Sequence, residues 1–173
     1  GDTTHRELKP RLGRQAALRY VHELAKHPDW DNQARAVGVD GSAPLAQAIA
    51  ALRRVARPGS LVVILSDFLD FSRAAQSYLS SVARHNEVLA VFLSDPLERH
   101  PPPPGRYRLV SSADELAIDT VSRSARRDYE TTFAARAEEL EAFCQRYGVH
   151  LMPMSTEDDP VTALQTALGR RTR

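Results

Sequence analysis

Oxygen-bearing side chains occur where the strands of a parallel sheet would end. Asp67 directly follows the apolar run Leu61–Ser66, and Ser94 and Asp95 directly follow a second such run. Ligands of open parallel sheets bind beyond the carboxyl ends of the strands. Oxygen ligands suit a hard cation such as Mg²⁺, which keeps several waters. The pattern predicts a divalent-cation site at this rim. Two more segments contribute to the rim, Asp40-Gly41-Ser42 and Ser155-Thr156-Glu157-Asp158-Asp159.

The same residue types also cap helices, so each has a second interpretation. For Ser72, Asp158 and Asp159 we favour capping, because each precedes a helical pattern. Ser42 precedes a helix that begins near residue 43, and for this residue capping and cation binding stay equally open. Asp67 ends a buried strand and precedes two apolar residues, which a cap explains poorly. We therefore predict a functional role for Asp67.

Enzyme signatures are absent from the sequence. His22 and His27 lie five residues apart, which places their rings about 140° apart on a helix and prevents them from sharing one zinc ion. The chain has no glycine-flanked serine nucleophile and no phosphate-binding glycine loop. A Mg²⁺-dependent hydrolase using Asp67, with Asp70 or Asp95 as base, is the alternative, but no nucleophile accompanies it. We expect a protein that is not an enzyme.

Three short apolar runs predict buried strands: Leu61–Ser66, Val88–Leu93 and Val149–Met154. Apolar residues at helical spacing surround them. This alternation predicts an α/β fold with a mostly parallel sheet and helices on both faces. The predicted helices lie at about 11–26, 45–55, 75–83, 125–147 and 161–168.

The segment of about 101–121 interrupts this alternation. Pro101–Pro104 and Gly105 cannot continue a helix or a central strand. Tyr107–Val110 and Leu116–Asp119 then read as two short strands. We predict a small β-hairpin inserted into a single domain that spans residues 1–173.

Composition limits the possible partners and location. The formal net charge of the 173 residues is +1, which gives no electrostatic reason to expect a nucleic acid partner. Cys144 is the one cysteine, which excludes an internal disulfide, and its place in a helical pattern predicts a packed thiol. The apolar runs are too short to span a bilayer, and the first residues do not form a signal peptide. We expect a cytoplasmic location without direct membrane contact.

Several segments, in order, resemble a bacterial family known as domain of unknown function fifty-eight. The most informative is the run 60–70, SLVVILSDFLD. The resemblance implies a von Willebrand factor A-like, Rossmann-like fold. It also implies a metal-ion-dependent adhesion site built from three loops, in which Asp67 matches the third-loop aspartate and Ser42 the second-loop threonine. The other matching segments are 5–11, 91–98, 107–109, 118–120, 146–149 and 155–158.

The first loop of that site, Asp-x-Ser-x-Ser, does not occur in the sequence. The resemblance therefore implies a domain truncated at its N-terminal side, with about half of the metal ligands. We expect Mg²⁺ or another divalent cation to bind the full-length protein, and to bind this fragment weakly or not at all. The family's strand order places Leu61–Ser66 beside the missing first strand. We expect this edge to be covered by Thr3–Leu8 or by self-association with a second copy.

The resemblance also implies a function. Domains of this kind bind protein ligands through a partner's acidic group that completes the coordination of the cation. Family members are often encoded beside MoxR-type AAA+ ATPases, which suggests such an ATPase as the protein partner in a chaperone-like or assembly role. A hydrolase and a purely structural scaffold are the alternatives.

Overall fold

The computed structural model describes residue 8 and residues 12–26, 44–110 and 115–169 of the chain. Helices and strands alternate through most of this part, as predicted. The elements, in order, are α1 (Arg14–Ala25), α2 (Pro44–Val55), β1 (Leu61–Ser66), α3 (Arg73–Ala83), β2 (Glu87–Ser94), α4 (Pro96–Arg99), β3 (Arg106–Val110), β4 (Glu115–Asp119), α5 (Arg123–Tyr147), β5 (His150–Ser155) and α6 (Pro160–Gly169).

Strands β1, β2 and β5 form a parallel sheet in the order β1-β2-β5. This arrangement confirms the predicted α/β fold with a parallel sheet. All three strands begin and end within one residue of their predicted bounds. The short apolar runs identified them because a central parallel strand such as β2 is buried on both faces.

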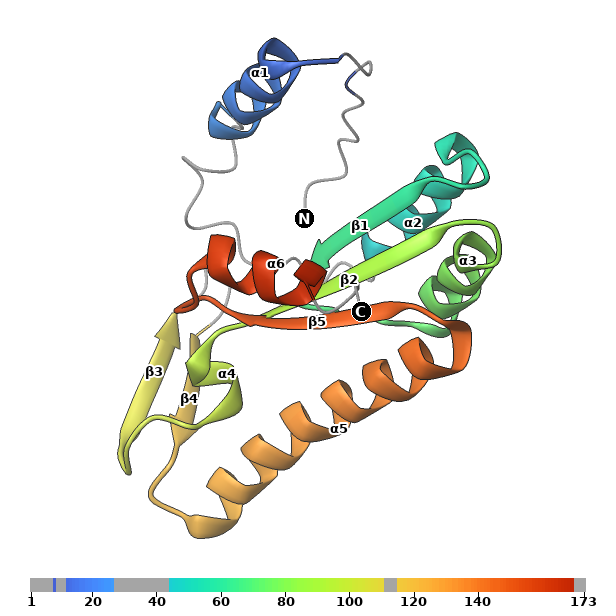
Figure 1. Cartoon of the computed structure of the whole chain (residues 1–173). Coiled ribbons are helices and arrows are strands. Elements are labelled where there is room, and N and C mark those ends of the chain that lie inside the picture. Colours follow the sequence, from blue (N-terminus) through green and yellow to red (C-terminus); the bar gives the residue numbers. More distant parts are fainter. Residues whose placement is uncertain (1–7, 9–11, 27–43, 111–114, 170–173) are drawn as a thin grey trace.

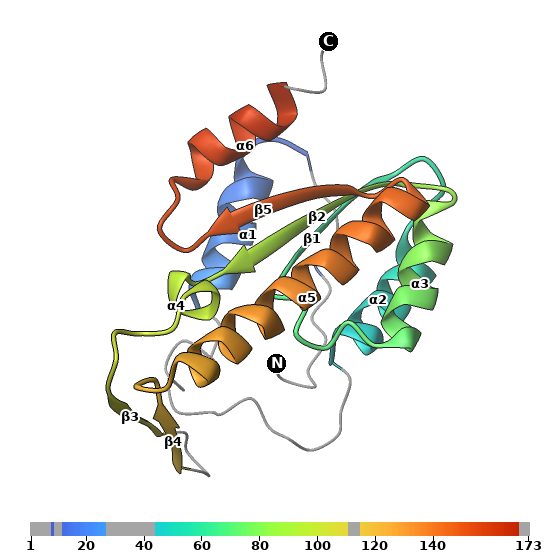
Figure 2. The same ribbon diagram turned by 90° about the horizontal axis from the view of Figure 1, so that it is seen from below.

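Helices cover the two faces of this sheet unequally (Figures 1 and 2). Helices α2, α3 and α5 pack on one face and enclose the main core, in which Phe68, Leu79 and Leu140 are fully buried. On the other face, α6 contributes Ala163 to a smaller apolar cluster with strands β2 and β5. None of the described helices is both long and apolar enough to cross a bilayer.

The predicted hairpin is confirmed. Strands β3 and β4 pair antiparallel and form a separate two-stranded sheet. Thr120 closes its base: the buried hydroxyl accepts the Gly105 N–H at 3.0 Å and lies 2.8 Å from the Pro103 carbonyl, to which it donates. The Thr120 hydroxyl thus supplies hydrogen-bond partners for backbone groups next to the proline run, which cannot form the regular hydrogen bonds of a strand.

Among the described strands, β1 pairs with β2 alone. Residues 3–7, which were predicted to cover its other edge, lie outside the described residues, and Leu8 is half-buried. Covering of this edge by that segment, or by a second copy of the chain, therefore stays a prediction.

The thiol of Cys144 is buried in α5, as predicted. Burial, with a smaller contribution from the charge of Glu141, raises the pKa of Cys144 from 9.0 to about 11. The thiolate is the reactive form. At pH 8 we expect native Cys144 to react with iodoacetamide about a hundredfold more slowly than in unfolded chain, as measured by mass spectrometry. Equal rates in the two states would contradict a packed thiol.

Candidate functional site

Asp67 lies at the carboxyl end of β1, at the start of the loop to α3. Its Oδ1 accepts the N–H of Leu69 at 3.1 Å, and the Ser66 hydroxyl accepts the N–H of Phe68 at 3.0 Å. The side chain is exposed, and within the described part of the chain its second oxygen, Oδ2, has no hydrogen-bond partner. One carboxylate oxygen therefore orients the side chain, and the other makes no hydrogen bond to a described residue.

Phe68 fixes the turn that presents Asp67. Its φ of 50° lies in the left-handed region, which is a rare conformation for a bulky residue. The ring is fully buried and meets Phe71 and Phe92 edge to face, with centroids 5.6 and 6.3 Å apart. Burial of the ring outweighs the cost of this backbone conformation, about 1–3 kcal/mol. The loop is therefore held by the core and not by its exposed atoms.

Ser94 and Asp95, at the end of β2, have internal partners. The guanidinium of Arg99 donates to the Ser94 hydroxyl from Nε at 3.0 Å and from Nη2 at 2.7 Å. Asp95 Oδ1 accepts the N–H of Leu97 at 2.8 Å, as the cap of α4. Asp95 Oδ2 accepts the hydroxyl of Thr156 at 2.9 Å. Neither residue presents an unused oxygen as Asp67 does.

The residues after β5 also bond within their own turn. Asp158 Oδ2 accepts the N–H of Ser155 at 2.7 Å and stabilises the turn, not a helix end. Asp159 Oδ2 accepts the N–H of Thr162 at 2.9 Å and caps α6, as predicted. Hydrogen bonds from Thr162 lower the pKa of Asp159. The predicted cap at Ser72 is also confirmed, since its hydroxyl accepts the N–H of Ala75 at 3.4 Å.

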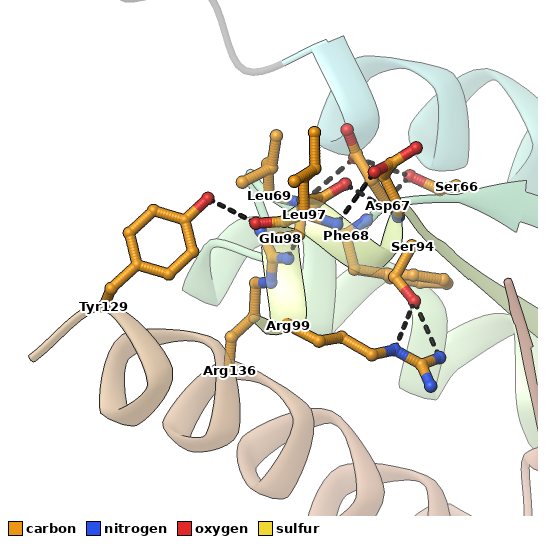
Figure 3. A network of polar contacts seen from close by, with 11 residues as sticks. Ser66, Asp67, Phe68, Leu69, Ser94, Leu97, Glu98, Arg99, Tyr129 and Arg136 are labelled. Atoms are coloured by element: carbon orange, nitrogen blue, oxygen red, sulfur yellow. Dashed lines mark hydrogen bonds and ion pairs between the residues drawn. The ribbon is translucent and has the colours of Figure 1, made fainter. Parts of the chain in front are cut away.

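Arg136 of α5 supports the loops from below (Figure 3). Its Nη2 donates to Glu98 Oε2 at 2.6 Å, and its guanidinium lies 5.2 Å from the Phe133 ring centroid and 5.8 Å from that of Phe92. The Tyr129 hydroxyl donates to the Leu97 carbonyl at 2.6 Å. These contacts attach α4 to α5. Sequence reasoning missed Arg136, although it follows Phe133 at helical spacing on the inner side of α5.

A hollow of about 270 Å³ separates the β1–α3 loop from α5. Residues 68–72 line one side, and Arg136, Glu139 and Leu140 line the other. Asp70 Oδ2 and Arg136 Nε are buried here and have no hydrogen-bond partner within the described residues. Gln76 donates to Glu139 at 2.8 Å across the space between α3 and α5. Asp70 therefore belongs to the inner side of the loop, and Asp67 to its outer side.

Two leucines near Asp67 are exposed. Leu69 is 59% exposed and Leu97 is 60% exposed, one on each of the loops that follow β1 and β2. In Figure 3 both side chains point away from α5. The two loops thus each place an exposed apolar side chain near the Asp67 carboxylate.

The described residues do not form a cation site by themselves. No three His, Cys, Asp or Glu side chains in this part of the chain lie close enough together to hold a metal ion. Asp67 is a rim carboxylate with one oxygen that bonds to no described residue, and Mg²⁺ is often bound through one or two carboxylates and several waters. Ser42 lies outside the described residues, so its predicted place beside Asp67 stays a prediction.

The fold and the loops at its strand ends define an α/β protein whose candidate site lies beyond the carboxyl ends of a parallel sheet. The family model "Protein of unknown function DUF58" matches residues 1–139, and the chain belongs to this family. It is 30% identical over 138 residues to the uncharacterized protein MAV169 of Mycobacterium avium, covering 79% of this chain and 80% of that protein. No solved structure matches the chain.

Proposed function

We propose that the chain is a non-catalytic, metal-dependent protein-binding module. One observation carries this proposal: at the sheet rim Asp67 presents a carboxylate oxygen that bonds to no described residue, on a loop that the buried Phe68 holds in place. Of the other rim carboxylates, Asp95 uses both oxygens, for the Leu97 N–H and the Thr156 hydroxyl, and Asp158 uses Oδ2 for the Ser155 N–H. A preformed loop with one open ligand suits recognition, because little ordering entropy is lost on binding.

The residues that would hold the cation are Asp67 and Ser42, both with oxygen ligands. When bound, the cation would supply positive charge and an open coordination position for an acidic group of the partner. Leu69 and Leu97 would then contact apolar side chains of the partner around this position. The protein partner that we propose is a MoxR-type AAA+ ATPase, in a chaperone-like or assembly role in the cytoplasm.

The hydrolase alternative has less support. Both oxygens of Asp95 are hydrogen-bonded, and Asp70 Oδ2 is buried in the hollow beside α5. A general base must reach the proton that it removes, directly or through one water. The scaffold alternative explains Ser72 and Asp159, which cap helices, but it does not explain the exposed Asp67.

Mn²⁺, a paramagnetic substitute for Mg²⁺, tests the cation site by broadening nearby amide signals. We expect selective broadening at residues 66–69 in the ¹⁵N-labelled 173-residue chain, lost in Asp67→Asn and retained in the matched control Asp128→Asn on exposed α5. Mg²⁺ should compete for the site at about millimolar concentration, because the described ligands are few. Equal broadening in Asp67→Asn and the unmodified chain would contradict a role for Asp67.

The partner is tested separately. A purified MoxR-type ATPase should bind at least about tenfold more tightly with Mg²⁺ than with EDTA, a difference of about 1.4 kcal/mol. This gain should be lost in Asp67→Asn. Mg²⁺-dependent phosphatase turnover that Asp67→Ala abolishes would support the hydrolase instead.

A further inference from the structure

The sheet face opposite the main core is one apolar surface, and β1 forms its uncovered part. The register places Val63 beside Leu89 and Leu65 beside Val91. Leu89 and Val91 are buried, and they cluster with Ala163 of α6. Leu61, Val63 and Leu65, the β1 side chains of this face, are 56%, 46% and 61% exposed. The apolar surface therefore continues beyond the part that α6 covers.

Helix α1 also has apolar side chains that no other described part of the chain covers. It is amphipathic, with Ala17, Leu18, Val21 and Ala25 at helical spacing, and none of its residues is buried. Leu18 and Val21 are 56% and 59% exposed. A helix of 12 residues is only marginally stable in water by itself. Its apolar side needs a surface to pack on if the helix is to persist.

The geometry matches α1 to the open face of β1. Figure 1 shows α1 beyond the β1 edge of the sheet, so β1 is the strand of the sheet nearest to it. At about 1.5 Å per residue α1 is about 18 Å long, and at about 3.3 Å per residue β1 is about 20 Å long. Residues 26–43 join α1 to α2 and can span up to about 60 Å. The reach of the chain is therefore sufficient for direct packing.

We propose that α1 docks on the β1 face, beside α6, through Leu18 and Val21 against Leu61, Val63 and Leu65. The docked helix completes the cover of the second sheet face. A segment of the same chain is favoured over a second copy, because a tether of this length keeps α1 at an effective concentration of about 1 mM near the face. Docking on this face is independent of the cation site at Asp67.

Cysteine cross-linking tests this docking in the 173-residue chain. We expect a short bis-maleimide to join Val21→Cys and Val63→Cys within one molecule, detected as a linked peptide pair in the monomer fraction. The matched control pairs Val63→Cys with Arg19→Cys, which lies about 160° from residue 21 on the helix. At least tenfold less product is expected from the control. Cys144 is buried and does not compete.

Three outcomes would overturn the proposal. Cross-linked dimers in place of monomers would assign the face to a second copy. Equal product from residues 19 and 21 would show an α1 that samples the surface without docking. No product from either pair would place α1 elsewhere.

Hydrogen exchange gives an independent measurement. Docked α1 should exchange its amide hydrogens at least about tenfold more slowly than an isolated peptide of residues 12–26. Val21→Glu should remove this protection and leave the core amides unchanged, because no residue of α1 is buried. Exchange at the peptide's rate in the unmodified chain would also refute docking.

Discussion

Phe68→Ala is expected to lower the free energy of unfolding by about 3–5 kcal/mol. The ring is fully buried among Phe71 and Phe92, so its removal leaves a cavity and deletes two edge-to-face contacts. Alanine also keeps the unfavourable φ of 50° without the packing that compensates for it. Urea denaturation followed by circular dichroism measures the change.

Leu69→Ala is the matched control for this substitution. Leu69 is the next residue in the same loop but is 59% exposed, so we expect a change within about 0.5 kcal/mol. Similar losses for the two variants would mean that the ring of Phe68 does not anchor the loop. Phe68→Ala should also weaken Mn²⁺ broadening around Asp67 at temperatures where the variant stays folded, because the loop loses its anchor.

Arg136→Ala is expected to lower the free energy of unfolding by about 2 kcal/mol. The substitution removes the ion pair with Glu98 and the contacts with the rings of Phe92 and Phe133. The Arg136 side chain is 19% exposed and that of Glu98 is 35% exposed. Solvent therefore screens the pair in part, and we expect less than the 3–5 kcal/mol typical of breaking a fully buried pair.

A double-mutant cycle with Glu98→Gln separates the ion pair from the ring contacts. We expect a coupling energy of about 1 kcal/mol, with the rest of the loss due to the aromatic contacts. Arg127→Ala, on an exposed turn of the same helix, should change stability by less than about 0.5 kcal/mol. A coupling energy near zero would show that Glu98 and Arg136 do not hold α4 against α5.

The hydrogen-bond partners of the aspartates at the carboxyl ends of the strands could not be predicted from the sequence. Asp67 and Asp95 both follow apolar strands, and their positions along the chain do not show which of their oxygens have partners. The structure separates them by their partners: Asp67 accepts from Leu69 in its own loop, whereas Asp95 also accepts from Thr156, which is 61 residues away. The spacing of residues along the chain does not predict a hydrogen bond between distant segments.

The contacts of Arg136 and Phe68, which hold the rim loops in place, could not be predicted from the residue pattern either. Arg136 bonds to Glu98, which is 38 residues away, and Phe68 adopts a left-handed φ that no local residue preference favours. Both depend on the aromatic cluster that forms when α5 packs on the sheet. The caps at Ser72 and Asp159 were predictable because their partners lie three residues away.

The sequence by itself determined the three parallel strands, the inserted hairpin, the helices between them and family membership. The strands, hairpin and helices follow from periodicity and turn residues over short stretches of chain, and family membership follows from the ordered set of matching segments. Only the tertiary structure decided which partners the rim carboxylates have, how Arg136 joins α4 to α5, and that the apolar face of β1 extends beyond the part that α6 covers. These features depend on which distant segments meet when the chain packs, and residue order along the chain does not specify such contacts one by one.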